Sequence, residues 1–285
     1  FGFTRLTLAP GQSRLVSSPF LVPDDSINAV LVGQLTGSDK EENADAILAW
    51  DSSIPGYLRA IKAGNTGNPD REGKWFEDFE NWKDSTITIN PGTGVFVVNK
   101  QAVTQEVYLA GELVLDDSAE VDFPGASLSL FGFPFLGAVG VAESGLADVG
   151  KVTDENGQAA ERLEVGRGYW CVRNALDAMV WKSVRPYSRV FSANNEAPRI
   201  TSLSPSSDGR SVTLGIQASG DAGGKVDVDV YCQDISTNAF SSESNWHVLA
   251  LELELGGARE WSWMEVLPTQ APQTRIYLLA NLAVD

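Results

Sequence analysis

The run Ile89-Asn90-Pro91-Gly92-Thr93-Gly94-Val95-Phe96-Val97-Val98 joins an aliphatic residue, a Gly-x-Gly turn and an apolar segment that carries an aromatic residue. The same pattern returns as Leu163-Glu164-Val165-Gly166-Arg167-Gly168-Tyr169-Trp170-Cys171-Val172. Glycines of this kind suit a turn that needs positive φ. A dinucleotide-binding motif would need a third glycine and a following helix, which both runs lack. The pattern therefore predicts a turn followed by a strand, present twice in the chain.

A second signature lies upstream of each run and recurs in the same order. Residues 11–20 (GQSRLVSSPF) return as residues 125–135 (GASLSLFGFPF), a strand that ends in Pro-Phe. Two signatures in one order predict two related β units. The first copy holds about forty extra residues, which include the acidic residues 39–45 and an aromatic cluster around Trp75.

Most of the chain consists of short apolar runs between turn residues. Its 27 Gly and 13 Pro separate segments of strand length, which is typical of sandwiches and barrels. One short helix is predicted after Asp24, Asp25 and Ser26, where a capping residue precedes apolar residues at helical spacing. The fold class is therefore all-β. Residues 1–120 form a first sandwich- or barrel-like unit with a long insertion, and residues 121–192 form a shorter one.

The last part of the chain has the length of one small sandwich. Apolar stripes occur at 212–216, 226–232 and 249–255, and a closing strand is expected at 275–281. Residues 192–198 read as a linker. Residues 198–285 therefore resemble an immunoglobulin-like or fibronectin type III domain.

A wider resemblance rests on several short motifs. They are Gly2-Phe3-Thr4, Leu15…Pro19-Phe20, residues 46–50, residues 90–96 and residues 109–113, with their counterparts in the second copy. Over residues 1–192 these motifs resemble uncharacterised secreted β-repeat proteins of planctomycete and verrucomicrobial bacteria. The resemblance implies export and a β fold. That group has no established activity, so no catalytic residue can be transferred from it.

Charge excludes one large class of partner. Lys and Arg number 21 against 38 Asp and Glu, which gives a net charge of −17. A phosphate backbone would be repelled by most of such a surface, so nucleic acid is not an expected partner. No apolar stretch is long enough for a transmembrane segment. The chain begins at Phe1 without Met, as a processed secreted protein or a trimmed one would, and we expect an extracellular or cell-surface location.

Catalytic residue types are scarce. The only histidine is His247, and no Gly-x-Ser-x-Gly elbow supplies a nucleophile for it. Cys171 and Cys232 are expected to be small buried side chains, with a disulfide between them as the alternative. We therefore expect no enzyme and no cofactor. A glycoside hydrolase remains the less favoured alternative, because it needs only two carboxylates.

Calcium is the one metal that the sequence leaves open. Hard-oxygen residues cluster in turn-like segments at Asp116, Asp117, Glu120 and Asp122, and again at Asn65, Asn68, Asp70 and Glu72. Neither cluster matches an EF-hand loop. Solvated acidic loops are the more ordinary interpretation.

Residues 75–82 (WFEDFENW) form the most aromatic segment of the chain. If it were helical, Trp75, Phe79 and Trp82 would share one face, which could stack on sugar rings. We favour the other interpretation, in which this face packs the insertion onto its own sheet.

The two ends of the chain read as strands that could pair with another subunit. The candidate assembly residues are Phe1, Phe3, Leu6 and Leu8 at one end and Ile276 and Leu278 at the other. Strands at a sheet edge carry open backbone groups. The expected function is therefore an extracellular, non-catalytic structural protein, self-associating through strand edges into a filament or surface layer. A polysaccharide-binding or adhesion module is the alternative.

Overall fold

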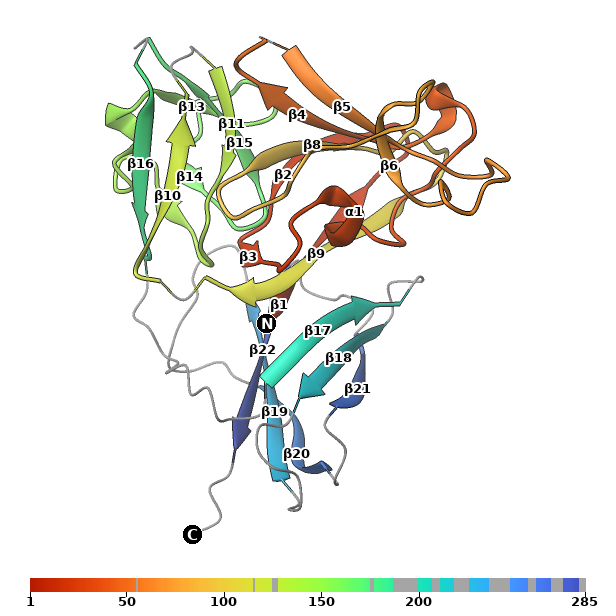
Figure 1. Cartoon of the computed structure of the whole chain (residues 1–285). Helices are drawn as coiled ribbons and strands as arrows, with labels where there is room; N and C mark the ends of the chain where they lie inside the picture. Colours follow the sequence, from red (N-terminus) through yellow and green to blue (C-terminus); the bar gives the residue numbers. More distant parts are fainter. Residues whose placement is uncertain are drawn as a thin grey trace.

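The computed structural model describes residues 1–54, 56–114, 116–124, 128–174, 177–186, 199–206, 211–217, 226–235, 247–255, 260–267 and 274–281. The prediction of an all-β fold is confirmed (Figure 1), because 51% of the chain is strand and 5% is helix. The predicted linker at 192–198 lies outside the described residues.

The first unit is an antiparallel β structure with one short helix. Its strands are β1 (Gly2–Leu8), β2 (Ser13–Ser17), β3 (Phe20–Leu21), β4 (Ala46–Asp51), β5 (Gly56–Lys62), β6 (Trp75–Asp78), β7 (Lys83–Asp84), β8 (Gly94–Val98) and β9 (Gln105–Leu113). One sheet has the order β2-β8-β4-β5-β6-β7. The predicted helix is confirmed as α1 (Ile27–Val30), and Ser26 caps it by accepting a hydrogen bond from the Ala29 N–H. A 3₁₀ turn, η1 (Glu41–Asn43), precedes β4.

The second unit is more compact. It contains β10 (Ser118–Phe123), β11 (Leu128–Gly132), β12 (Val139–Gly140), η2 (Leu146–Asp148), β13 (Lys151–Thr153), β14 (Arg162–Leu163), β15 (Gly168–Val172) and β16 (Met179–Val184). Its sheets have the orders β11-β15-β13, β10-β16 and β12-β14.

The two units share their pairing residue by residue. Ser17 lies opposite Gly94 where β2 pairs with β8, and Gly132 lies opposite Gly168 where β11 pairs with β15. In the same way β1 and β9 match β10 and β16, with Leu8↔Gln105 corresponding to Phe123↔Met179. Strand β4 joins β8 as β13 joins β15. We call positions that share a place in these registers equivalent.

The two Gly-x-Gly turns lock the units together. The Ser17 N–H donates to the Gly166 carbonyl, and the equivalent Gly132 N–H donates to the Gly92 carbonyl. Each unit thus gives the other the same contact, as in an isologous interface. A Cβ on Gly94 would lie 2.7 Å from the Phe131 carbonyl oxygen, so only glycine allows this approach.

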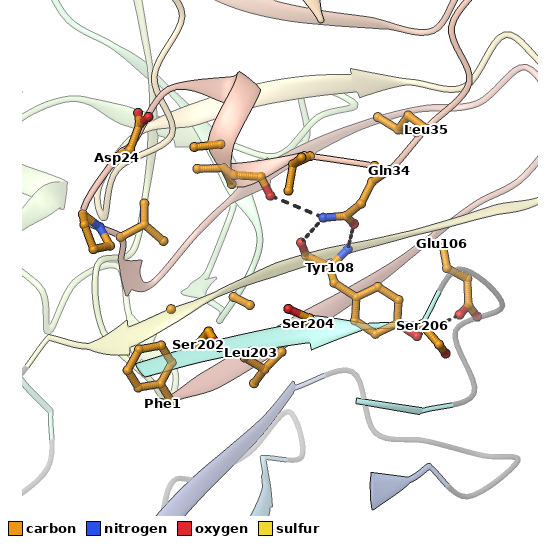
Figure 2. Close-up of a pocket in the computed structure, with 18 of the residues that line it drawn as sticks. Phe1, Asp24, Gln34, Leu35, Glu106, Tyr108, Ser202, Leu203, Ser204 and Ser206 are labelled. Carbon is orange, nitrogen blue, oxygen red and sulfur yellow. Dashed lines mark hydrogen bonds between the residues drawn. The ribbon is translucent and has the colours of Figure 1, made fainter. Parts of the chain in front are cut away.

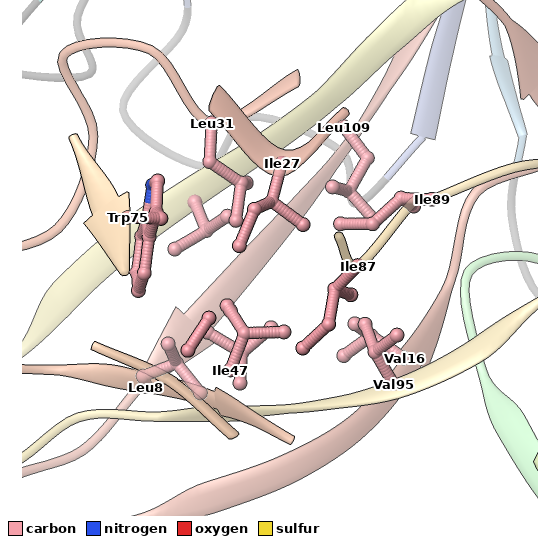
Figure 3. Packing of buried hydrophobic residues seen from close by; sticks show 13 residues of the cluster. Leu8, Val16, Ile27, Leu31, Ile47, Trp75, Ile87, Ile89, Val95 and Leu109 are labelled. Carbon is pink, nitrogen blue, oxygen red and sulfur yellow. The ribbon is translucent and has the colours of Figure 1, made fainter. Parts of the chain in front are cut away.

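Each unit has its own hydrophobic core. The first core (Figure 3) consists of Leu8, Val16, Ile27, Leu31, Ile47, Ala60, Trp75, Ile87, Ile89, Val95, Val97, Val107 and Leu109. The second consists of Val114, Val121, Phe123, Phe131, Phe133, Phe135, Leu146, Val152, Leu163, Tyr169, Cys171 and Trp181. The second core is richer in aromatic rings, since it contains four phenylalanines, Tyr169 and Trp181, whereas Trp75 is the single aromatic residue of the first among the residues described.

The C-terminal strands pack as two sheets. They are β17 (Arg199–Pro205), β18 (Ser211–Gln217), β19 (Val226–Ile235), β20 (His247–Leu255), β21 (Glu260–Val266) and β22 (Thr274–Asn281). One sheet is β17-β18-β21, and the other runs β20-β19-β22-β1-β9-β3. The third core therefore takes Phe3 and Tyr108 from strands of the first unit. Its assignment to the immunoglobulin or fibronectin class stays a prediction.

The expectation that the terminal strands are open edges is wrong where they pair with each other, at residues 2–4 of β1 and 274–276 of β22, whereas the described pairings of Leu6 and Leu8 are with β9. Gly2 and Phe3 of β1 pair with Ile276 and Arg275 of β22, and β9 lies along the other side of β1. Leu278 of β22 pairs in turn with Tyr231 of β19. Figure 1 shows β22 beside β1 at the junction with the first unit. The physical reason is that Phe3 and Leu8 belong to two different cores, so β1 is sealed on both faces.

The two cysteines are free and buried. Cys171 belongs to the second core and Cys232 to the third. The disulfide alternative is therefore wrong, and the interpretation as small buried side chains is confirmed.

Candidate functional site

The aromatic segment 75–82 is not helical. It forms β6, a turn and β7, and Trp75 is fully buried in the first core. The backbone N–H of Trp75 donates a hydrogen bond to the side-chain oxygen of Asn28 at 3.0 Å, which links β6 to α1. Trp75 is therefore not available to a sugar, and the packing interpretation is confirmed for it.

Phe79 and Trp82 pack on each other at the tip of this hairpin. Their ring centroids lie 4.8 Å apart at an interplanar angle of 42°. The Arg71 guanidinium lies over the Trp82 ring, 4.2 Å from its centroid. A cation already covers this face of the indole, so the pair is not a flat open platform.

A second aromatic group, which the sequence did not single out, lies where the two units meet. Trp50 and Tyr57 of the β4–β5 hairpin and Phe96 of β8 surround Trp170 of β15, with centroid distances of 5.6, 6.3 and 6.1 Å. Phe96 and Trp170 are equivalent positions. The rings of Trp50 and Trp170 meet edge to face at 78°, so this group fills the joint and presents no parallel rings.

The predicted calcium residues lie on or just before β10. Asp116, Asp117, Glu120 and Asp122 are all exposed. Asp117 forms an ion pair with Arg185 at 2.6 Å, and Glu120 lies opposite Lys182. Among the described residues, no group of three or more His, Cys, Asp or Glu is placed to hold a metal ion. The structure therefore presents these four residues as an acidic strand and does not gather them around one point.

The other acidic candidates close a loop. The Glu72 carboxylate accepts hydrogen bonds from the Thr66 hydroxyl at 2.9 Å and from the backbone N–H groups of Asn65 and Thr66. The Thr66 hydroxyl is the main reason that the pKa of Glu72 lies below its usual value. These three hydrogen bonds to the Glu72 carboxylate all come from its own loop.

A pocket of about 870 Å³ lies between the first unit and the C-terminal sheets (Figure 2). Segment 21–35, with α1, forms one wall, residues 104–111 of and beside β9 form the floor, and β17 with Ser206 forms the opposite wall. Leu21, Val30, Leu35 and Leu203 supply apolar surface. The volume is in the range of small-molecule sites.

The polar groups of this pocket bond mainly to each other. The Gln34 side-chain amide donates a hydrogen bond to the Tyr108 carbonyl at 3.0 Å and accepts one from the Tyr108 backbone N–H at 2.6 Å. It thus makes the two hydrogen bonds that a neighbouring strand would make with this residue of β9. The Tyr108 hydroxyl lies 3.1 Å from Glu106, and burial, followed by that carboxylate, raises the pKa of Tyr108 to about 12. The lining thus combines apolar side chains, a self-bonded Gln34–Tyr108 pair and the carboxylates of Asp24 and Glu106. Sequence reasoning missed it because three distant segments build it.

A buried polar group ties the C-terminal sheets together. The Tyr277 hydroxyl lies 2.6 Å from the Glu265 carboxylate, which also pairs with Arg275. Burial is the largest cause of the raised pKa of Tyr277, and Glu265 adds to it. Because all three side chains lie inside the protein, this group stabilises the joint between β21 and β22 and offers nothing to a ligand.

In the part of the chain that the structure describes, the helices are too short to cross a membrane. Comparison with protein-family models, with curated proteins and with solved structures finds no match to this chain.

Proposed function

We propose that the protein is an extracellular, non-catalytic structural or surface protein of a bacterium, which acts by holding other polypeptide chains. The observation that supports this most is the six-stranded sheet β20-β19-β22-β1-β9-β3, which joins the first unit to the C-terminal strands. With the interlocked turns, it links three cores into one framework. Such a framework suits a load-transmitting or spacing role.

Two fully buried polar side chains, Asp45 and Asn99, support the same proposal. Asp45 is fully buried and accepts hydrogen bonds from the N–H groups of Thr36 and Lys100, both at 2.7 Å, and from the Gln105 amide. Asn99 is also fully buried, and its side-chain amide donates hydrogen bonds to the Leu8 and Val103 carbonyls. These groups are saturated by protein partners, so they fix loops and strands and have no capacity left for a substrate.

The charge of −17 bears on how assembly would respond to solution conditions. Acidic molecules repel one another until salt screens them or a cation bridges them. We therefore expect assembly to depend on ionic strength or on divalent cations.

The test is the size and shape of the protein purified from its native source without denaturation. Negative-stain electron microscopy and light scattering, with and without EDTA and at two salt concentrations, should show ordered assemblies above the 30.6 kDa chain mass. Single particles of that mass under every condition, with no other protein attached, would contradict the proposal.

A second candidate function is the binding of a small amphipathic molecule, favoured by the pocket beside α1. Native mass spectrometry of the purified protein should then detect a retained small molecule. Ala29→Trp, which places an indole into the pocket wall, should abolish its retention, whereas Val103→Trp at an exposed site outside the pocket should not. Polysaccharide binding through Trp75 is no longer proposed, because that side chain is buried.

A further inference from the structure

We propose that the edge of β10 opposite β16, which no described strand occupies, binds an extended, basic strand of another protein, which adds to the β10–β16 sheet. This inference rests on the proposed function and names its partner surface. It begins with the equivalence of the two units. Strand β1 has β9 on one side and β22 on the other, whereas β10 has β16 on one side. In the described residues, no strand occupies the side of β10 that corresponds to β22.

The direction of the backbone groups of β10 follows from one hydrogen bond. The Arg185 N–H donates to the Asp117 carbonyl at 2.9 Å, so Asp117 faces the β16 side. Alternate residues of an antiparallel strand direct their N–H and C=O groups to opposite sides. Ser118, Glu120 and Asp122 therefore direct theirs away from β16, toward the unoccupied side.

In the first unit, the side of β1 that is equivalent to the outer side of β10 pairs with a strand, β22. Phe3 is equivalent to Ser118, and it lies opposite Arg275 of β22. Next to it, the Tyr277 N–H donates to the Phe1 carbonyl at 2.8 Å. The strand on this side is antiparallel. An antiparallel strand on β10 would reproduce this arrangement at residues 117–119, which are equivalent to residues 2–4, and would extend it along Glu120 and Asp122.

Charge determines which strand fits. Glu120 and Asp122 are exposed on β10, and Asp116 and Asp117 lie just before it, while Lys182 lies opposite Glu120 and Arg185 forms an ion pair with Asp117. Opposite charges on neighbouring strands stabilise pairing, and like charges destabilise it. A second copy of β10 would place carboxylates against carboxylates. The partner strand therefore carries Lys or Arg and belongs to another protein.

The neighbouring face offers additional contact area. Val180 and Val184 of β16 are 51% and 67% exposed. They are equivalent to Glu106 and Ala110 of β9, whose sheet packs against the C-terminal core. A strand that reaches β10 from a folded partner would bring apolar surface over these two valines.

The experiment uses the whole purified protein and a synthetic peptide that alternates Lys with Val. Fluorescence anisotropy should detect binding, and hydrogen exchange by NMR should slow at the Ser118, Glu120 and Asp122 amides. The control is the same peptide with alternate backbone amides N-methylated, which keeps the charge and removes strand pairing. Loss of binding by the methylated peptide is expected. Equal binding of both peptides would overturn the proposal, because charge attraction alone would then account for it.

Two variants test the site on the protein. Glu120→Pro removes an N–H on the open side without removing a β10–β16 hydrogen bond, and it should abolish the slowed exchange. Glu120→Lys with Asp122→Lys should weaken binding about tenfold while leaving the fold intact. Asp70→Lys with Glu80→Lys makes the same charge change at exposed residues elsewhere and should leave binding unchanged. Equal weakening by both double variants would overturn the proposal.

The outcomes separate this inference from the proposed function. If native assemblies exist but neither peptide binds β10, the inference fails and the structural role stands. If the Lys-Val peptide pairs with β10 while the native protein is always a lone monomer, the strand site stands and the structural role fails. A dimer of the pure chain that Glu120→Pro abolishes would overturn the choice of a basic partner in favour of a second copy.

Discussion

The β1–β9 sheet and the β10–β16 sheet have one register and opposite surroundings. In the first unit, Phe3 and Tyr108 face the third core, and β22 extends the sheet. At the equivalent positions the second unit has Ser118 and Lys182, and no described C-terminal strand joins their sheet. The same backbone arrangement thus serves once as an internal joint and once as a polar, accessible strand pair. The difference lies in a few side chains, because the backbone pairing is common to both.

The insertion makes a second contrast between the units. In the first unit, β5, β6 and the segment with α1 extend the core beyond β4 and bring in Trp75, Ile27 and Leu31. The second core contains Phe133 and Phe135, whose equivalents in the first unit are Ser18 and the buried Phe20. The insertion is therefore part of the first core, and its removal would leave an open sheet.

The largest expected effect comes from this difference. Trp75→Ala should lower the free energy of unfolding by about 3–5 kcal/mol, because a fully buried indole leaves a cavity in the first core. Trp82→Ala is the matched control on the same hairpin, where the ring packs under Arg71. Urea denaturation followed by circular dichroism measures both. Equal losses for the two variants would show that the insertion does not belong to the first core.

Replacing glycine by alanine should destabilise the protein more in one of the interlocked turns than in the other. At Gly94 an added Cβ would lie 2.7 Å from the Phe131 carbonyl oxygen, and backbone cannot move aside easily. At Gly168 it would lie 2.8 Å from the flexible Leu15 side chain and 3.0 Å from the Val16 carbonyl oxygen. Gly94→Ala should therefore destabilise by about 1–3 kcal/mol.

Gly168→Ala should cost less than Gly94→Ala in the same denaturation experiment. Gly145→Ala is a useful reference, because its Cβ would meet nothing within 4 Å and only its φ of 76° is strained. If Gly168→Ala proved the more damaging change, the close approach of the Gly94 turn to β11 would be incorrect.

A smaller effect is expected at one equivalent position where the two cores carry different side chains of similar size. Cys171 occupies the position equivalent to Val97, and both are fully buried. Burial raises the pKa of the Cys171 thiol to about 11, with Arg173 opposing the shift. Cys171→Val should change stability by less than about 1.5 kcal/mol.

The thiol itself should resist reaction in the folded protein. Iodoacetamide at pH 8 should label Cys171 only after unfolding, since the thiolate is the reactive form. Rapid labelling of the native protein would mean that the second core opens readily.

The sequence identified the strand class, the short helix and both paired signatures because these depend on local pattern. Gly-x-Gly followed by a short apolar run specifies a turn and a buried strand. The burial of both cysteines was also predicted correctly, because Cys171 lies in such an apolar run and Cys232 lies in a segment that alternates apolar and polar residues. The burial of Trp75 was the favoured interpretation, but its strand conformation was not, because a segment of eight residues satisfies helical and strand spacing equally well.

The remaining errors concern contacts between distant segments. Nothing near Phe3 in the sequence indicates that Arg275 lies opposite it, so local pattern predicts open edges for β1 and β22. The pocket beside α1 needs Gln34, Tyr108 and Leu203 together, and no local pattern links them. The acidic residues of β10 were recognised by composition, but composition cannot distinguish a loop that surrounds an ion from a strand that points its carboxylates to solvent.

The smallest expected effect is a local response to acid in the insertion. The Thr66 hydroxyl, and then the backbone amides, keep the pKa of Glu72 below its usual 4.5. The folded state therefore binds this proton less readily than the unfolded state, so the contribution is present above pH 4.5 and is lost as the pH falls through the lowered pKa. NMR should show the Asn65 and Thr66 amides losing hydrogen-exchange protection over that window, while the β11–β15 amides keep theirs. Glu72→Gln should remove the pH dependence at those two amides. If the second unit lost protection at the same pH, the insertion and the second unit would open as one, and the independence of their cores would be refuted.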